Sequence, residues 1–436
     1  MLNGLFIVVA LASILLAAYT GEMRAVTDAM LNSARNAVDL AIGLIGVMAF
    51  FLGLMKVAQD AGLTAHLSRL VSPFMRLLFP SVPAGSPAMS AMVLNISANM
   101  LGLGNAATPF GIKAIEELDR YNSRKGTATN AMALFLAINT AGLAVLPSGV
   151  LGVRAALGSA DAAGIWFPTW FASACATVVG ITAAIGLSRL PRYRSTEPPP
   201  LALSDLPSRM SNGTNAADQN EPPAPSVEPT RLWLGRLFWL SFFAFTAVHI
   251  AQRTANESLG AVMRDILSFW MLPALVASIT LYGWVRQVPV YESLVEGAKE
   301  GFQVAQRIIP FLVVILVVIG MFRASGGLDV MVTIISPVTA LVGMPAEALP
   351  MALLRPLSGS GALGVASEAM TVYGPDSLIG YMVSTYQGST ETTFYTLAVY
   401  FGAIGVKVGR HTVVACLMAD VTGILAATFI VNLMYG

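Results

Sequence analysis

The chain has 436 residues, of which 56% are hydrophobic and 11% are charged, and its formal net charge is +1. Soluble domains carry about 25% charged residues, so this composition predicts an integral membrane protein. A net charge so close to zero argues against nucleic acid as a partner. The cysteines Cys175 and Cys416 lie far apart in apolar runs, which is typical of small hydrophobic residues and not of a disulfide. The histidines are scattered, and their spacing predicts no metal site.

The first apolar run, residues 2–19, is open to two interpretations. A cleaved signal peptide is one, but no Lys or Arg precedes the run, and the run is long for such a peptide. We therefore expect a retained first span. Further runs are long enough to cross about 30 Å of hydrocarbon, and they lie at 39–57, 128–150, 163–188, 232–252, 266–285, 308–325, 378–404 and 412–435.

Two other stretches, 63–79 and 289–307, mix charged and apolar residues at helical spacing. This pattern predicts amphipathic helices at the membrane interface.

Residues 190–230 have a different composition from the rest. They are rich in proline, contain five acidic residues and have few large apolar ones, which predicts a disordered linker. The linker divides the chain into a first unit, 1–189, and a second unit, 231–436. We expect the linker to be cytoplasmic.

The two units resemble each other. The segment "AVTDAMLNSARNAVDLA" (25–41) is similar to "PVYESLVEGAKEGFQVA" (289–305), and Ser72-Pro73 matches Ser336-Pro337 at the same offset. Two segments rich in Gly and polar residues, 95–111 and 355–370, then occupy corresponding places. Interrupted hydrophobic segments at matching places are a sequence sign of a transporter site. The alternative is that small residues merely permit tight helix packing.

The orientation of the units depends on whether these two segments cross the membrane. If each segment is re-entrant, an odd number of crossings separates the units and the repeats are inverted. If each segment crosses fully, the repeats are parallel. The re-entrant arrangement, with the N-terminus in the cytoplasm, places most of the Lys and Arg residues on the cytoplasmic side, as the positive-inside rule requires. We expect an all-α polytopic membrane protein of two inverted-topology repeats with re-entrant or broken helices.

Charged and hydroxyl residues mark the second unit. Arg355 and Glu368 lie at membrane depth, where ionisable groups are costly and face a cavity or a partner. Ser358 and Ser360 lie in a Gly-rich break whose backbone N–H groups are able to bind an anionic group. A structural alternative is that Arg355 pairs with Glu368 or with Glu391.

The stretch "YQGSTETTFY" (386–395) interrupts an apolar run. In a helix, Ser384, Gln387, Glu391 and Tyr395 share one face. The Glu391 carboxylate is a candidate ligand for a hydroxyl, an amine or a coupling cation, and the Gln387 amide is able to donate and accept hydrogen bonds. The alternative is a broken helix whose hydroxyls satisfy their own backbone.

The first unit offers neutral groups in corresponding places. The candidates are Asn95, Ser97, Asn99, Asn105 and Asn139. Asparagine within a membrane is also able to act only as a hydrogen-bonding contact between helices. Asp420, in the last apolar run, ranks below Glu391 as a functional carboxylate.

Longer motifs carry a family resemblance. "GLIGVMAFFLGLMKVAQDAGL" and "NMLGLGNAATPFGIKAIEEL" resemble bacterial spore maturation protein A, whereas "RPLSGSGALGVASEAM" and "QGSTETTFYTLAVYFGAIGVK" resemble spore maturation protein B. The chain is therefore identified as a fused A/B member of the nucleoside-recognition, or Gate, family. The resemblance implies a multi-pass protein of the bacterial inner membrane. It also implies a solute-reading role for Gln387, Thr390 and Glu391, since nucleoside transporters of the wider family use a Gln-Thr-Glu cluster.

We expect a secondary transporter of a small polar solute, nucleoside-like or another metabolite, driven by H⁺ or Na⁺ and without a cofactor. The expected partners are the lipid bilayer and the solute, and a homo-oligomer stays open. No Walker motif, Cys/His cluster or nucleophile elbow occurs, so an enzyme is not expected. The alternative function is a non-transporting membrane scaffold or sensor, linked to envelope or spore maturation, with the linker as its docking element.

Overall fold

The computed structural model describes the backbone of residues 2–83, 85–102, 104–145, 147–199, 229–256, 262, 266 and 270–436. Within these residues the chain is helical and contains no strand, apart from an isolated bridge between Thr127 and Val408. This confirms the all-α class. Most of the predicted linker, 200–228, lies outside the described residues.

The first unit begins with a helix of 19 residues and a helix of 38 residues, and the helices after them have 23 residues or fewer. Its α-helices are α1 (Leu2–Thr20), α2 (Met23–Asp60), α3 (Leu63–Leu78), α4 (Pro87–Met100), α5 (Gly104–Arg120), α6 (Asn130–Ala141), α7 (Ser148–Ala156) and α8 (Trp166–Ser188). The short helix α9 (Pro191–Arg194) lies inside the predicted linker, so the prediction of disorder is wrong for these residues. The second unit repeats the order that starts at α2, and two described helices precede the helix equivalent to α2, whereas one precedes α2 itself. Its helices are α10 (Pro229–Thr254), α12 (Met271–Val285), α13 (Val290–Ala324), α14 (Gly327–Ala340), α15 (Leu349–Leu354), α16 (Gly359–Tyr373), α17 (Leu378–Ser389), α18 (Thr393–Ala403) and α19 (Thr412–Tyr435).

The sequence similarity at constant offset corresponds to a shared turn. Helix α2 passes into α3 through Gly62, and α13 passes into α14 through Gly326, and both glycines have φ of +76°. This left-handed conformation is unfavourable for residues with a Cβ, which explains glycine at both positions. In the second unit the turn bends the chain by 84° between Leu316–Ala324 and Gly327–Ala340.

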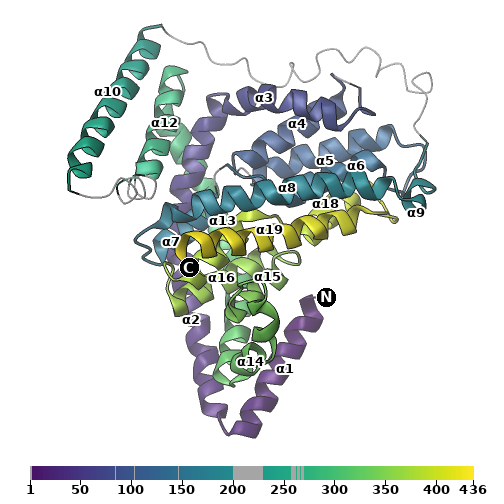
Figure 1. The fold of residues 1–436 in the computed structure, drawn as a ribbon, viewed down its shortest axis with the longest axis vertical. Coiled ribbons are helices and arrows are strands. Elements are labelled where there is room, and N and C mark those ends of the chain that lie inside the picture. The colour runs from purple at the N-terminus through teal and green to yellow at the C-terminus, as the bar shows by residue number, and fades with distance from the viewer. Residues whose placement is uncertain are drawn as a thin grey trace.

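Corresponding helices of the two units pair in opposite directions. Helices α2 and α13 approach so closely that a Cβ on Gly297 would lie 2.5 Å from the Leu52 carbonyl oxygen, whereas the opposite end of α13 packs on the start of α2. Helices α8 and α19 lie side by side and across the direction of α2 (Figure 1). The Tyr435 hydroxyl, at the end of α19, donates to the carbonyl of Gly164, which precedes α8 (2.8 Å). Antiparallel equivalents are what inverted repeats require, although the orientation of each unit in a membrane stays a prediction.

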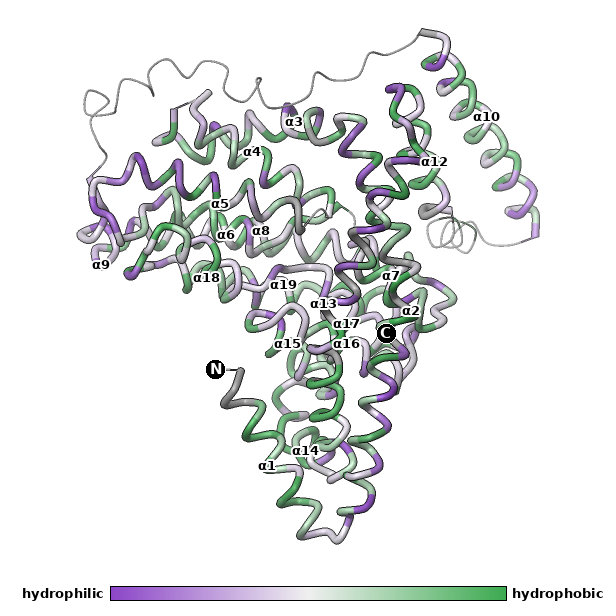
Figure 2. The backbone as a smooth tube through the Cα atoms, turned by 180° about the vertical axis from the view of Figure 1, so that it is seen from behind, coloured by the Kyte–Doolittle hydropathy of each residue, from purple (hydrophilic) through white to green (hydrophobic). Residues whose placement is uncertain are grey.

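Three helical segments in the described part of the chain are long and apolar enough to span a membrane: Ala162–Ser188, Thr230–Thr254 and Thr412–Tyr435. The bent pair Leu316–Ala324 and Gly327–Ala340 is a fourth candidate. Helix α10 is apolar along most of its length (Figure 2), and its large side chains Trp233, Leu240 and Phe243 are exposed. These features agree with a multi-pass membrane protein.

Three of the helical segments predicted from the sequence are wrong. The runs 128–150 and 378–404 are not continuous spans, because each is broken into two helices, α6 with α7 and α17 with α18. The stretch 289–307 is not a separate interfacial helix, because it forms the first half of α13. The stretch 63–79 does form its own helix, α3. Part of the predicted run 266–285 falls outside the described residues.

Candidate functional site

The breaks in α6–α7 and α17–α18 touch each other. Helix α6 ends at Gly142 in a left-handed conformation, with φ of +55°, and α17 ends at Thr390 in an extended one. The backbone N–H of Glu391 donates to the carbonyl of Thr140 (2.8 Å). A Cβ at Gly142 would lie 3.1 Å from Glu391 Cγ, so glycine lets the two breaks approach.

Each break is also held by the helix pair that precedes it. The N–H of Val145 donates to the carbonyl of Met100 at the end of α4 (2.8 Å), and the N–H of Phe394 donates to that of Pro356, between α15 and α16 (3.0 Å). The Gly-rich segments predicted from the sequence therefore lie beside the breaks. We call this region the crossing point, and it comprises residues 99–102, 139–145, 355–359 and 387–394.

Arg355 holds the second break together. It is buried, and its guanidinium donates to the Thr390 carbonyl and to Thr392 Oγ1 (3.2 Å). The side chain of Glu391 is 54% exposed, and its nearest carboxylate oxygen lies 3.9 Å from Arg355 Nη2. This distance is the outer limit of an ion pair, so Glu391 keeps lone pairs for another partner. Of the two structural partners considered for Arg355, the structure provides Glu391 and not Glu368.

Of the other candidates in the second unit, one serine caps a helix, and one amide oxygen lacks a hydrogen-bond partner among the described residues. Ser358 Oγ accepts from the N–H of Gly361 (3.0 Å) and caps α16, while Ser360 lies partly buried in the first turn of that helix. Gln387 Nε2 donates weakly to the Gly359 carbonyl (3.4 Å). Its Oε1 is buried and has no hydrogen-bond partner among the described residues.

Two of the first-unit amides reach the crossing point. Asn99 Nδ2 donates to Asn139 Oδ1 (2.9 Å), and Asn139 Nδ2 donates to the Phe135 carbonyl one turn earlier in α6 (2.9 Å). This pair ties the end of α4 to the end of α6. Both asparagines therefore form a hydrogen-bonding contact between helices, which was the alternative to a role in solute binding. This contact lies at the break between α6 and α7.

The remaining amides lie further from the break. Asn95 is buried between α4 and α5, where its Nδ2 donates to the Ala107 carbonyl (2.8 Å) and to the Tyr400 hydroxyl (3.2 Å). Ser97 Oγ accepts from Ser68 of α3 (3.1 Å). The side chain of Asn105 lies outside the described part of the structure.

A buried acid lies directly behind the second break. Thr393 Oγ1 donates to Asp420 Oδ2 (2.6 Å), and the other oxygen of this carboxyl has no hydrogen-bond partner in the described chain. The hydroxyl of Thr390 is likewise buried without a partner there. Unsatisfied buried polar atoms are rare, so they mark a place where a ligand, a proton or water is able to bind.

Glu368 is separate from this group. It pairs with Arg323 in a cavity between α2, α7, α13 and α16. It lies about 13 Å along α16 from Gly359, at 1.5 Å per residue. The sequence prediction that placed Glu368 and Arg355 in one site therefore joins two places that the fold keeps apart.

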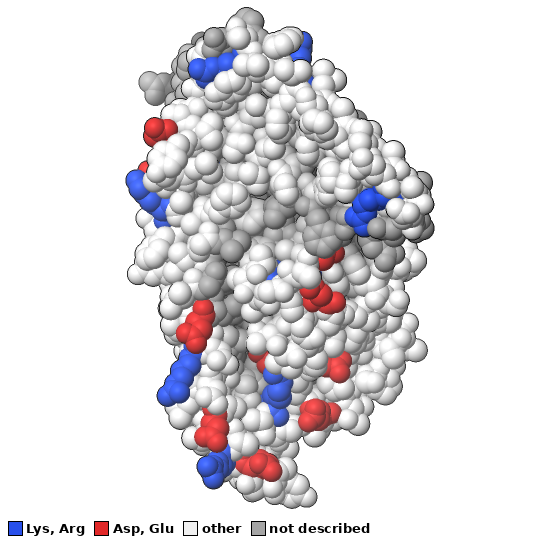
Figure 3. Space-filling view, turned by 90° about the vertical axis from the view of Figure 1, so that its left-hand side faces the viewer, with Lys and Arg blue, Asp and Glu red and all other residues white. Residues whose placement is uncertain are grey.

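The crossing point brings four helix ends together. The C-terminal ends of α6 and α17 carry partial negative charge, and the N-terminal ends of α7 and α18 carry partial positive charge. Such ends are able to bind ions of either sign at membrane depth. Among the described residues, no group of three His, Cys, Asp or Glu side chains is placed to hold a metal ion. One face of the molecule is mostly uncharged, with small groups of acidic and basic side chains and no broad basic patch (Figure 3).

Comparison with known proteins identifies the family. The model of the Gate family, described as nucleoside recognition, matches residues 41–157 and 305–407. The chain belongs to the Gate family. Both matched segments contain a helix pair and a broken helix of the crossing point.

Two relatives from Bacillus subtilis (strain 168) are each similar to less than half of this Gate protein. Spore maturation protein B is 49% identical over 170 residues, which is 39% of this chain and 96% of the relative. Spore maturation protein A is 37% identical over 194 residues, which is 44% of this chain and 97% of the relative. A single chain that resembles both, each nearly whole, agrees with the predicted fused A/B protein.

More distant matches also exist. Inner membrane protein YjiG of Escherichia coli (strain K12) is 36% identical over 83 residues, 19% of this chain and 54% of that protein. Among solved structures, the Alcanivorax borkumensis YdaH transporter covers 98% of this chain and 96% of its own, with 13% identity and a TM-score of 0.37.

Sequence reasoning missed a fully buried arginine that joins the two units of the Gate protein. The guanidinium of Arg154, in α7, donates to the Pro375 carbonyl (2.6 Å), to Ser384 Oγ (3.2 Å) and to Asp376 Oδ1 (2.8 Å). It also lies 4.4 Å from the centre of the Tyr381 ring. Pro375 and Asp376 directly precede α17, and Tyr381 and Ser384 lie in its first two turns, so α7 of one unit holds the start of the broken helix of the other.

Arg410 makes the corresponding contact at the opposite end. It lies between α18 and α19 and donates to Asn130 Oδ1 (2.9 Å) and to the Ala128 carbonyl (3.2 Å) at the start of α6. It also binds the carboxylate of Glu197, just after α9. We call Arg154 and Arg410 with these partners the two clasps. The apolar neighbours of Arg154 in "SGVLGVRAA" are a signal that could have indicated its burial.

Proposed function

We propose that this Gate-family chain is a secondary transporter of a small polar solute, nucleoside-like or another metabolite, driven by H⁺ or Na⁺. The observation that carries the proposal is the contact between two unwound segments, one from each unit, through Glu391 N–H and the Thr140 carbonyl (2.8 Å). Opened backbone at membrane depth is tolerated where protein or a water-filled cavity surrounds it. Broken helices of this kind form the central sites of secondary transporters.

Glu391 is the residue proposed to bind the coupling ion or a polar group of the solute. Its side chain is 54% exposed, and its carboxylate is only loosely paired with Arg355, at 3.9 Å. A proton or Na⁺ on Glu391 would weaken this attraction, and Arg355 would then keep its bonds to Thr390 and Thr392. Ion binding would in this way change the second break without dismantling it.

Gln387 and Thr390 are proposed to read the solute. The Gln387 Oε1 and the Thr390 hydroxyl are buried without a partner among the described residues, so each is able to form a hydrogen bond with a bound solute. The Asn99–Asn139 pair supports the opposite wall from the first unit (2.9 Å). A solute with several donors and acceptors matches such a lining, because amides provide both.

The test is solute uptake into proteoliposomes, after a thermal-shift screen of nucleosides, amino acids, peptides and metal ions has selected the solute. Glu391→Gln should reduce the initial rate at least about tenfold, as expected for the loss of about 1.4 kcal/mol. The control is Glu296→Gln, an exposed carboxylate on α13 paired with Lys299. Full uptake by the Glu391→Gln protein would remove Glu391 from this role, and no uptake of any solute would contradict the transporter proposal.

The coupling ion is identified by imposing a Na⁺ gradient and a pH gradient separately on the same vesicles. The gradient that drives the solute above equilibrium should lose this effect in Glu391→Gln. Membrane orientation is tested with a tag at Gly436. Our proposed inverted arrangement, with a cytoplasmic linker in a bacterial inner membrane, places this end outside the cytoplasm, and a cytoplasmic tag would contradict it.

A second function, a membrane scaffold or sensor, is favoured by the attachment of the linker start. Glu197 pairs with Arg410, and Ser123 Oγ donates to the Pro199 carbonyl (2.6 Å). A partner that pulled on the linker would therefore act on a clasp. Deleting residues 200–228 separates the two functions: a transporter should keep uptake, whereas a scaffold should lose its partners.

A further inference from the structure

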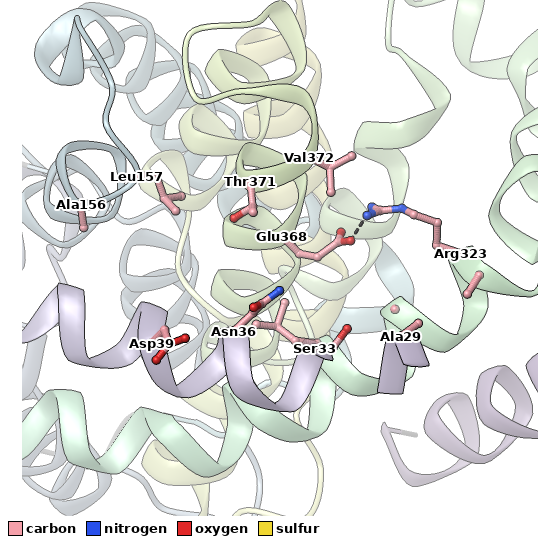
Figure 4. A pocket seen from close by; sticks show the side chains of 13 residues that line it. Ala29, Ser33, Asn36, Asp39, Ala156, Leu157, Arg323, Glu368, Thr371 and Val372 are labelled. Carbon is pink, nitrogen blue, oxygen red and sulfur yellow. Dashed lines mark ion pairs between the residues drawn. The ribbon is translucent and has the colours of Figure 1, made fainter. Parts of the chain in front are cut away.

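A cavity of about 480 Å³ lies away from the crossing point. Its walls come from α2, α7, α13 and α16, so both units line it (Figure 4). Sites for small molecules have volumes of about 300–1,000 Å³ and often lie between helices or domains. The cavity is therefore large enough for a metabolite.

The charges in this cavity leave a negative excess. Glu368 on α16 forms an ion pair with Arg323 on α13, and the Arg323 guanidinium also lies 5.9 Å from the centre of the Tyr373 ring. Asp39 on α2 is exposed to the cavity and makes no ion pair within the described residues. With one guanidinium against two carboxylates, the lining favours a cation.

Neutral polar groups surround these carboxylates. Figure 4 shows Ser33 and Asn36 of α2 on the side that faces Glu368, with Thr371 on the same helix as Glu368. Hydroxyl and amide groups of this kind both donate and accept hydrogen bonds. Gly320 of α13 packs directly against Ser33, and a Cβ there would collide with the Ser33 hydroxyl. The close packing fixes the position of one polar group.

The rest of the lining is apolar. Leu157 of the α7 end, Leu316 of α13 and Val372 of α16 face the same space. An apolar surface with a few convergent polar groups is the usual composition of a small-molecule site. It would cover the carbon skeleton of a ligand whose charged group reaches Asp39.

We propose that this cavity binds a small solute that carries an ammonium group beside hydroxyl or carbonyl groups. The ammonium binds the Asp39 carboxylate, and its neighbouring oxygens bond to the polar groups of Ser33, Asn36 and Thr371. The proposal goes beyond transport, because binding here does not require the crossing point to move a solute.

The experiment measures binding to the purified full chain in detergent, so it does not depend on transport. The probe is D-glucosamine, and N-acetyl-D-glucosamine is its uncharged counterpart with the same hydroxyl groups. Asp39→Asn should weaken glucosamine binding at least about tenfold, which corresponds to about 1.4 kcal/mol. Val372→Trp, which fills the cavity without removing a charge, should abolish binding.

Two variants serve as controls. Asp28→Asn removes a carboxylate from α2 that is 63% exposed, outside the cavity, and should bind as the wild type does. Glu296→Gln, which removes an exposed carboxylate of α13 outside the cavity, should also leave glucosamine binding unchanged. The proposal is overturned if glucosamine shows no saturable binding in the millimolar range, if N-acetylglucosamine binds equally well, or if Asp39→Asn or Val372→Trp binds as the wild type does.

Discussion

Replacing Arg154 with alanine tests how firmly the two units are joined. Breaking a buried ion pair costs about 3–5 kcal/mol when the remaining charge is left without a partner. Without Arg154, the Asp376 carboxylate would still have partners. Its side chain is 35% exposed, and it accepts from Ser159 Oγ (2.5 Å) and from the N–H of Ala160 (2.7 Å). The carbonyl of Pro375, by contrast, loses a donor at 2.6 Å, and a buried group left unsatisfied costs about 1–3 kcal/mol.

The lost contact with a tyrosine ring adds to this cost, at about 0.5–2 kcal/mol for a cation–π pair. We therefore expect Arg154→Ala to lower the free energy of unfolding by about 3 kcal/mol, at the low end of the range for buried pairs. The assay is reversible denaturation in mixed micelles, monitored by tryptophan fluorescence. The control is Arg24→Ala, whose side chain is 96% exposed and 3.9 Å from Asp28, and which should cost less than about 1 kcal/mol. Equal stability of the two variants would refute the view that Arg154 holds the units together.

Further predictions concern packing, pH and the buried acid. Gly297→Ala should destabilise the protein by about 1–3 kcal/mol, because the new Cβ would lie 2.5 Å from a carbonyl of α2, whereas Gly186→Ala, with nothing within 4 Å, should not; the same denaturation assay compares them. Burial, followed by a neighbouring arginine charge, lowers the pKa of His411 to about 4, so its contribution to stability should be complete above pH 6.5 and lost as the pH falls toward 4. A His411→Asn variant with the same pH profile as the wild type would contradict this. Thr393→Val should lower the free energy of unfolding by about 1–3 kcal/mol, because the buried Asp420 carboxyl loses its hydrogen bond at 2.6 Å. Adding Asp420→Leu should recover part of this loss in the same denaturation assay. A double variant no more stable than Thr393→Val would contradict the view that the unsatisfied carboxyl causes the loss.

The repeated architecture was predictable because it rests on local rules. Hydrophobic runs predicted the helical class, and the nearly constant offset between the units predicted the repeat; the structure shows matching left-handed turns at Gly62 and Gly326 within it. A left-handed turn favours glycine in both units, so the repeated turn is visible in the sequence as a glycine at each position. The offset alone could not show that the matched helices pair antiparallel, since pairing depends on contacts between distant residues.

The breaks in two predicted spans escaped sequence reasoning for a physical reason. Hydropathy averages over about 19 residues, and 128–150 and 378–404 remain apolar on both sides of the break. The local signs were present, in Gly142 and Pro147 for one and in Thr390 for the other. A polar cluster such as "QGSTETT" fits either a helix face or an unwound segment, and only packing against Thr140 distinguishes them.

The candidate site was partly accessible from spacing. Arg355, Gln387 and Glu391 converge because a short helix pair and a broken helix return the chain to the same place. Glu368 was grouped with them because it is near in sequence, but α16 carries it away toward another cavity. Besides local bonds to Ser159 and Asp161, Arg154 binds Pro375, Asp376 and Ser384 of the other unit, and no local sequence pattern contained those three partners.

The two clasps and the crossing point form one symmetric arrangement. Helices α6 and α17 each have 12 residues, a length of about 18 Å, with a clasp at the first end and the crossing point at the second. Each clasp arginine comes from the opposite unit, so each clasp ties one unit to the start of the other unit's broken helix. The two breaks meet where the Glu391 N–H donates to the Thr140 carbonyl, so both clasped helices end at the same point. Neither unit completes the crossing point alone, which gives a physical reason for holding both in one chain.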